Sequence, residues 1–279
     1  MRLPVPFLSL LLALMPAPAA QAVPPPERAL VFTRTAEYRH DSIPAAVAML
    51  QRIAATEGMQ VDHSENAADF TPANLARYRV VVFASTTGDV LDDPQQAALE
   101  GFIRAGNGFV GLHAAADTEY DWPWYGHLVG AYFHSHPPGL QTSRVQPERD
   151  GRARGAAWTV HDELYNYRDT PRGRVQVVAT VDERLYDGGR MGNDHPITWC
   201  HAFDGGRSWY TGLGHDAAVY RLPAFEAQVR QGLRYAAGRS GQCRARRLRL
   251  PPGARGVLPV LPVETVDLQR RQIHAVYAA

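Results

Sequence analysis

Three short apolar runs, separated by segments with helical spacing, constrain the fold of this chain more than any other feature. The runs lie at 28–33, 80–84 and 107–112, and polar residues bound each of them. A short apolar run between turn signals is typical of a strand that is buried on both faces of a parallel sheet. The order strand, helix, strand, helix, strand therefore predicts an α/β fold in which helices flank a parallel sheet.

Two segments between these runs have the signals of helices. Ser42 can cap the first helix and Gly58 can end it. A further strand is expected directly after this helix, at 59–63. Pro94 begins the second helix, at a position where its missing N–H costs nothing, and Gly106 ends it. The first helix carries one apolar face at helical spacing, made of Ile43, Val47, Leu50 and Ile53.

The pattern changes after Tyr120, where strands become shorter and turns more frequent. Asp204, Gly205 and Gly206 separate two β-rich runs, which is a hairpin signal. A last amphipathic helix is expected at 223–237, ended by Gly238. The chain should therefore add a β-rich portion to its parallel sheet, with strands at 175–180, 195–203 and 207–213.

The two ends of the chain differ in character from the rest. Residues 1–22 run from Arg2 through an apolar stretch into small residues, which is the pattern of a secretory signal peptide. The stretch is shorter than the roughly 20 residues that span a bilayer, and Pro16 and Pro18 would break an anchoring helix. We expect export to the periplasm or the extracellular space, with a domain at 23–238 and an arginine- and proline-rich tail at 239–279.

Charge and cysteine content exclude several classes of protein. A net charge of +1 and a mean hydropathy of −0.29 describe an ordinary globular chain without the basic surface of a nucleic-acid-binding protein. Cys200 and Cys243 could form one bridge in an oxidising compartment. We expect them to be unpaired, because Cys200 lies in an apolar strand and Cys243 beyond the last helix. Cys200 and His201 point to opposite faces of a strand and cannot form a catalytic dyad.

Polar residues follow the first and third buried strands. Ligands of open α/β sheets bind outside the carboxyl ends of the strands, so these loops are the first candidates for a site. The first loop carries Arg34, Tyr38 and His40, and the loop after the third strand carries His113 and Asp117. We expect both loops to lie at the same edge of the sheet.

His113 is the strongest single candidate. A lone histidine at a strand end is more often a hydrogen-bonded core residue. Here Gly111 precedes it and three alanines follow, which permits a sharp strand-to-helix turn that holds the imidazole at the sheet edge. An imidazole with a pKa near 6.5 suits general acid–base catalysis or metal ligation.

Trp122 and Trp124 flank a proline and are the candidates for sugar binding. An indole offers a flat apolar face that can pack against the C–H face of a sugar. Such a pair also occurs in ordinary cores, but here carboxylates that could accept hydrogen bonds from hydroxyls lie close by, at Asp117, Glu119 and Asp121.

Further histidines leave a zinc site open as an alternative. His134 and His136 point to the same side of an extended strand and could share one ion. His195 begins a strand after a glycine-containing turn, and His215 follows a glycine-containing turn at a strand end. We nevertheless expect no bound metal or other cofactor, because the chain contains neither a helical HExxH nor a CxxC motif.

Several segments taken together resemble the ThuA-like (trehalose-utilisation) family, which has a flavodoxin-like, class I glutamine amidotransferase-like fold. The resemblance covers nearly everything from Ala29 to Gly238 and leaves out the leader and the tail. The matching segments are YRHDSI (38–43), GFVGLH (108–113), YDWPWY (120–125), 133–137, DELY (162–165), 191–201, and 206–210 through Gly214 and His215.

This resemblance implies a role in the use of disaccharides, especially trehalose and related 3-keto-glycosides. True amidotransferases place a nucleophilic cysteine at the turn after the third buried strand, where this chain has His113. Because no thiol occupies that turn, we reject glutamine amidotransferase chemistry.

Three hypotheses about activity remain open. The first is an enzyme that acts on a sugar by acid–base chemistry, with His113 as proton carrier, His40, His195 and His215 as its partners, and Asp117 and Glu163 orienting them. The second is a non-catalytic carbohydrate-binding protein, and the third is a zinc-dependent hydrolase. In each case the partner is a small sugar, with no nucleic acid and no membrane insertion, and a homo-oligomer is compatible with the sequence. The expected sugar-binding side chains are Arg34, Tyr38, Trp122, Trp124, His136 and Tyr165.

Overall fold

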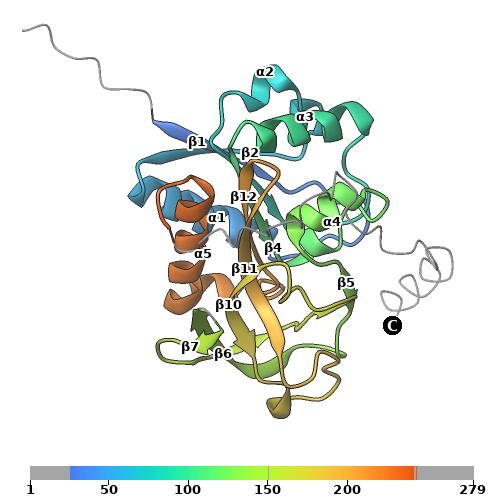
Figure 1. Cartoon of the computed structure of the whole chain (residues 1–279), viewed down its shortest axis with the longest axis vertical. Helices are drawn as coiled ribbons and strands as arrows, with labels where there is room; N and C mark the ends of the chain where they lie inside the picture. The colour runs from blue at the N-terminus through green and yellow to red at the C-terminus, as the bar shows by residue number, and fades with distance from the viewer. Residues whose placement is uncertain (1–25, 150, 242, 244–279) are drawn as a thin grey trace, which may run out of the picture.

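The order of strands divides the sheet into a parallel half and an antiparallel half. In the computed structural model, which describes residues 26–149, 151–241 and 243, ten strands pair in the order β2-β1-β3-β4-β12-β11-β10-β6-β7, with β8 added on β6 (Figure 1). The parallel strands are β2 (Met59–Ser64), β1 (Glu27–Phe32), β3 (Val80–Ala84), β4 (Gly108–Leu112) and β12 (Gly206–Thr211). The predicted α/β fold with a parallel core sheet is confirmed.

The antiparallel half is the β-rich portion expected after Tyr120. It is continuous with the parallel half, because β12 pairs with β4 on one side and with β11 on the other. Its strands are β11 (His195–Phe203), β10 (Gln176–Val181), β6 (Gln141–Arg149), β7 (Arg152–Ala153) and β8 (Trp158–Asp162). Two short strands, β5 (Phe133–Ser135) and β9 (Asn166–Tyr167), pair separately.

Helices cover both faces of the parallel strands (Figure 1). The alternation of side chains along β4 shows the two layers, because neighbouring residues of a strand face opposite ways. Gly108 packs against the backbone of Ala236 in α5 (Pro223–Ala236), while Phe109 contacts Tyr125 of α4 (Pro123–Val129). On the α5 side lies α1 (Ile43–Thr56), and on the α4 side lies α3 (Asp93–Arg104) next to the short α2 (Pro72–Leu75).

The local signals were confirmed for α3 and only partly for α1. Asp92 and Gln95 form a reciprocal capping box at the start of α3, with proline in its first turn. Ser42 stands at the N-cap of α1, but its side chain does not cap the helix. Its hydroxyl instead donates a 2.9 Å hydrogen bond to the carbonyl of Gly214. A tertiary contact has therefore replaced the expected local one.

A disulfide joins Cys200 in β11 to Cys243, with their Cα atoms 6.1 Å apart. Our expectation of unpaired cysteines was wrong. It treated Cys243 as lying beyond the folded domain, whereas α5 packs along the sheet and returns the chain to the start of β4. Both cysteines are buried as a result.

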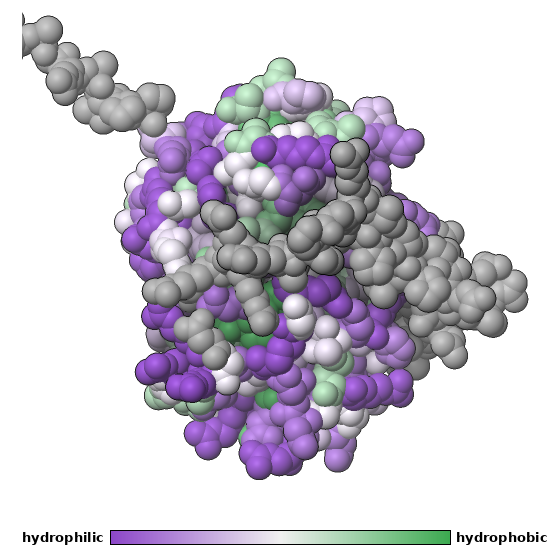
Figure 2. All heavy atoms as spheres, viewed as in Figure 1, coloured by the Kyte–Doolittle hydropathy of each residue, from purple (hydrophilic) through white to green (hydrophobic). Residues whose placement is uncertain are grey.

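The predicted signal peptide at 1–22, and the predicted tail apart from residues 239–241 and 243, lie outside the described residues. None of the described helices combines the length and apolar character needed to cross a bilayer. Hydrophilic residues dominate the coloured surface in Figure 2. Among the described residues, the exposed large hydrophobic side chains are Tyr38 and Leu185.

Candidate functional site

His113 lies at a sharp turn directly after β4. It opens a short 3-10 helix, η2 (His113–Ala116), and has a φ of +49°. Positive φ is uncommon for residues other than glycine, although histidine is among the enriched types, and such backbone outliers cluster at functional sites. A side chain at Gly111 would collide with the ring of Tyr210, 2.9 Å away. The predicted strand-to-helix turn is therefore present, and Gly111 makes room for it.

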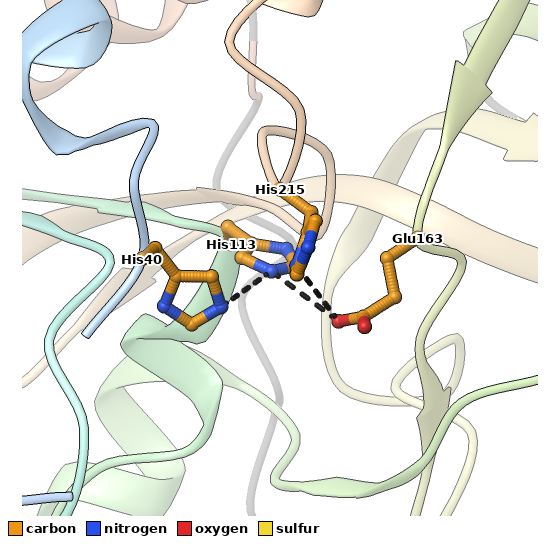
Figure 3. Close-up of side chains that lie close together, drawn as sticks. All are labelled: His40, His113, Glu163 and His215. Atoms are coloured by element: carbon orange, nitrogen blue, oxygen red, sulfur yellow. Dashed lines mark hydrogen bonds and ion pairs between the residues drawn. The ribbon is translucent and has the colours of Figure 1, made fainter. Parts of the chain in front are cut away.

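Four side chains from distant parts of the sequence converge at this turn (Figure 3). His40 comes from the loop before α1, Glu163 follows β8, and His215 follows β12. Nε2 of His113 lies 3.1 Å from Nε2 of His40 and 3.5 Å from Oε2 of Glu163. Nδ1 of His215 lies 3.3 Å from the same Oε2. We call His40, His113, Glu163 and His215 the His/Glu centre.

Three contacts hold His113 in place, two to its ring and one to its backbone. Its Nδ1–H donates a 2.9 Å hydrogen bond to the carbonyl of Gly212, because that carbonyl can only accept. In the neutral ring this leaves Nε2 without a proton and directed at the centre. The ring of Tyr165 packs against it at 4.3 Å, and the hydroxyl of Tyr210 donates to the His113 carbonyl.

A buried carboxylate, Asp162, holds the loop that carries His215. It accepts hydrogen bonds from the backbone N–H groups of Gly214, at 2.6 Å, and Asp216, at 2.9 Å. The hydroxyl of Ser42 completes the support by binding the carbonyl of Gly214. Sequence reasoning missed both roles. The available signal was the position of Asp162 at the end of a strand, one residue before Glu163.

Burial and charge set the protonation of the centre. Burial, together with the neighbouring imidazoles of His113 and His215, lowers the pKa of His40 to about 2. Burial raises the pKa of Glu163, but the three imidazoles around it outweigh this effect and hold it below its usual range. Burial lowers the pKa of His215, but the Glu163 carboxylate outweighs it and the net shift is upward. At neutral pH the centre therefore combines a neutral His40 with an ionised Glu163.

Solvent reaches the centre on the side of His215 and Tyr38. The side chain of His113 is fully buried, while that of His215 is 26% exposed. Tyr38 is 39% exposed, and its ring lies 4.8 Å from that of His40 and 6.5 Å from that of His215. His136 borders the same region, with Nδ1 3.2 Å from Oε1 of Glu163. Of the predicted sugar-binding residues, Tyr38, His136 and Tyr165 thus lie at the centre.

The remaining predicted catalytic residues are held elsewhere. His195 is fully buried, with Nε2 2.9 Å from the carbonyl of Tyr165 and Nδ1 2.7 Å from Glu183. It supports the residue that packs on His113 and does not itself join the centre. Asp117 is buried and accepts a hydrogen bond from the hydroxyl of Tyr120. Arg34 is exposed on the loop after β1.

The structure does not bring Trp122 and Trp124 to the His/Glu centre. The indole N–H of Trp124 donates to Asp204 in the turn before β12, and that of Trp122 donates to Glu100 in α3. The start of β12 pairs with the start of β4, so this turn lies at the opposite end of the strands from His113. A hollow of about 690 Å³ between β10 and α5 also contains none of the predicted site residues.

Four residues could together hold a metal ion. Each member of the His/Glu centre offers one ligand atom, and these atoms all lie within 4.8 Å of one another. The pair that suggested zinc in the sequence separates: His134 is exposed and contacts the Ser135 hydroxyl, while His136 turns toward Glu163.

Comparison with known proteins gives a consistent result over most of the chain. A family model described as ThuA, trehalose utilisation, matches residues 28–236. A protein of Bacteroides uniformis whose solved structure is described as ThuA-like has 20% identity and a TM-score of 0.63, over 79% of this chain and 95% of that one. One of Parabacteroides merdae, also described as ThuA-like, has 18% identity and a TM-score of 0.63, over 86% and 96%. These likenesses concern the fold. No curated protein matches the chain.

Proposed function

The chain belongs to the ThuA trehalose-utilisation family, and from this premise we propose that it is an exported enzyme that acts on a disaccharide, or on its 3-keto form, at the His/Glu centre. The observation that carries the proposal is the convergence of three imidazoles and one carboxylate at the turn after β4. This is the edge of the sheet at which α/β proteins bind their ligands.

The reaction class that suits this centre is acid–base chemistry beside a carbonyl. A carbonyl acidifies the adjacent C–H bond, so a base can remove that proton, and a glycosidic oxygen on the next carbon can leave once it is protonated. If the oxygen is retained, a proton must return to the former carbonyl carbon while the neighbouring hydroxyl becomes the new carbonyl, and the result is isomerisation. A base and an acid must each lie within about 3 Å of the atoms they serve. The ionised Glu163 can accept a proton, and the partly exposed His215, whose Nδ1 lies 3.3 Å from Oε2 of Glu163, can donate one.

The disulfide supports export. Disulfides persist in oxidising compartments such as the periplasm and the extracellular space, and are rare in the cytosol. The Cys200–Cys243 bridge and the leader-like residues 1–22 point to the same compartment.

The experiment is incubation of the purified protein with a panel of disaccharides and their 3-keto forms, followed by product analysis. We expect turnover of at least one member, and its loss in His113→Asn, since asparagine tolerates the positive φ of this position. His161→Gln is the matched control, because His161 is exposed and contacts the Thr142 hydroxyl. Unchanged turnover in His113→Asn would remove this centre from the reaction. Protection against thermal unfolding by a sugar without any product would indicate a binding protein instead.

A further inference from the structure

We propose that the His/Glu centre binds one divalent metal ion of the zinc class, through Nε2 of His40, Nε2 of His113, Oε2 of Glu163 and Nδ1 of His215. The inference rests on the proposed function in one respect only, namely that the same centre is the place of reaction. It assigns the four side chains as ligands of an ion that would polarise a sugar oxygen or lower the pKa of a bound water, and that water would then accept the proton in place of Glu163.

The spacing of the ligand atoms fits one shared ion. Zinc binds imidazole nitrogen and carboxylate oxygen at about 2.0–2.2 Å, and in a tetrahedral site this sets neighbouring ligand atoms about 3.3–3.5 Å apart. The three adjacent pairs of the centre are separated by 3.1, 3.5 and 3.3 Å. All four atoms lie within 4.8 Å of one another, so a single ion can reach each of them.

Hydrogen bonding within the centre does not satisfy all of its buried atoms. Nδ1 of His215 is buried and makes no hydrogen bond, although Oε2 of Glu163 is only 3.3 Å away. The two facing Nε2 atoms of His40 and His113 can share at most one proton between neutral rings. Buried polar atoms are nearly always paired, so atoms left over at the focus of a cluster need another partner. A cation supplies that partner to all of them at once.

The surroundings of His113 and Glu163 match those of metal ligands, whereas Nδ1 of His40 is buried and makes no hydrogen bond. A metal-binding histidine usually donates its other ring N–H to a backbone carbonyl or carboxylate, which orients the ring. His113 does so to Gly212, at 2.9 Å. The second oxygen of Glu163 lies 3.2 Å from His136, and the backbone beside His215 is held by Asp162.

The donor set and its charge indicate the kind of ion. Three neutral imidazoles and one carboxylate suit zinc and its neighbours in the first transition row, whereas calcium and magnesium prefer oxygen ligands. One negative charge from Glu163 leaves the bound ion a net positive charge. The ion would then act as a Lewis acid on a carbonyl or hydroxyl oxygen that enters from the side of Tyr38 and His215.

The test measures metal binding without reference to turnover. After loading with zinc and removal of the excess, elemental analysis of the wild-type protein should give about one zinc per chain, and cobalt loading should give a visible absorption band. His215→Gln and Glu163→Gln should each weaken zinc binding by at least about 100-fold, because they remove a direct ligand. His161→Gln should bind like the wild type. His215 is partly exposed, so its replacement is the variant expected to keep the fold, and circular dichroism checks this.

The outcomes separate the metal from the proposed function. A zinc content near zero after loading, or equal zinc binding in the wild type and both ligand variants, would overturn the metal site. Zinc binding that depends on the four ligands, together with no turnover across the sugar panel, would leave the metal site standing and remove the proposed reaction. Full turnover by chelator-treated, zinc-free protein would leave the proposed reaction standing and remove the ion from it.

Discussion

Breaking the Cys200–Cys243 disulfide should lower the stability of this protein by an amount that follows from the loop it closes. The two cysteines are 43 residues apart in the sequence. Closing a loop of this length removes about 13 cal/mol/K of entropy from the unfolded chain, or about 4 kcal/mol at 25 °C. Serine is close to cysteine in size, so the folded state should keep most of its packing when the buried Cys243 is replaced by serine.

The assay is chemical unfolding of oxidised wild type, reduced wild type and Cys243→Ser at one temperature. We expect the reduced protein and the variant to agree with each other and to lie about 4 kcal/mol below the oxidised protein. For a domain of about 200 residues this corresponds to a fall of about 8–16 °C in Tm. A difference below about 1 kcal/mol would refute the reasoning, because the chain after α5 would then be held in place without the bridge.

Three further predictions follow from other parts of the structure. Asp162→Asn should lower the free energy of unfolding by about 1–3 kcal/mol, because it weakens the hydrogen bonds that hold the loop of His215. The same variant should bind zinc more weakly, and zinc binding equal to that of the wild type would contradict the role of Asp162 in holding this loop. Burial lowers the pKa of His201 from 6.5 to about 4. Between pH 4 and pH 6.5 the unfolded chain therefore binds more protons than the folded chain, so the free energy of unfolding should fall as the pH is lowered from 6.5 to 4. His201→Gln should reduce that slope, by at most about 1.4 kcal/mol per pH unit, and an unchanged slope would contradict the assignment. Tyr38→Ala should weaken sugar binding by up to about tenfold in calorimetry, and Trp124→Ala should leave it unchanged; the opposite result would move the sugar site to the other end of the sheet.

Much of the fold could be predicted because its signals are local. The apolar runs became β1, β3 and β4, and Gly58 and Gly106, both with positive φ, follow the helices that they were expected to end. The edge of the sheet at which His40, His113 and His215 meet followed from strand direction alone. Predictions from local signals were wrong where a distant partner competed for the same group. The hydroxyl of Ser42, for example, donates to the carbonyl of Gly214 and does not cap α1.

The membership of the site was less predictable, because it depends on which way each side chain turns. His195 and His215 looked equivalent in the sequence, each beside a glycine-containing turn. In the structure one ring nitrogen of His195 contacts the carbonyl of Tyr165 and the other contacts the carboxylate of Glu183. No spacing in the sequence indicated these partners. The tryptophans were misassigned for a different reason: within ten residues of His113 the chain leaves the edge of the sheet, and Trp122 contacts Glu100 of α3. Proximity in sequence to a site residue was therefore a poor guide.

The side chain at the turn after β4 limits the chemistry that the site can perform. His113 stands at this turn, with a φ of +49°, and is surrounded by two imidazoles and a carboxylate, and no thiol stands there. A neutral imidazole with its other nitrogen bound to a carbonyl is a weak nucleophile toward amides but a good base and metal ligand. The neighbours His40, Glu163 and His215 could serve a nucleophile at this turn, but the turn carries no thiol, and each of them can also act around a cation or a developing charge on a sugar. The residue at the turn and the three around it therefore form one cluster that suits the acid–base or metal chemistry proposed above.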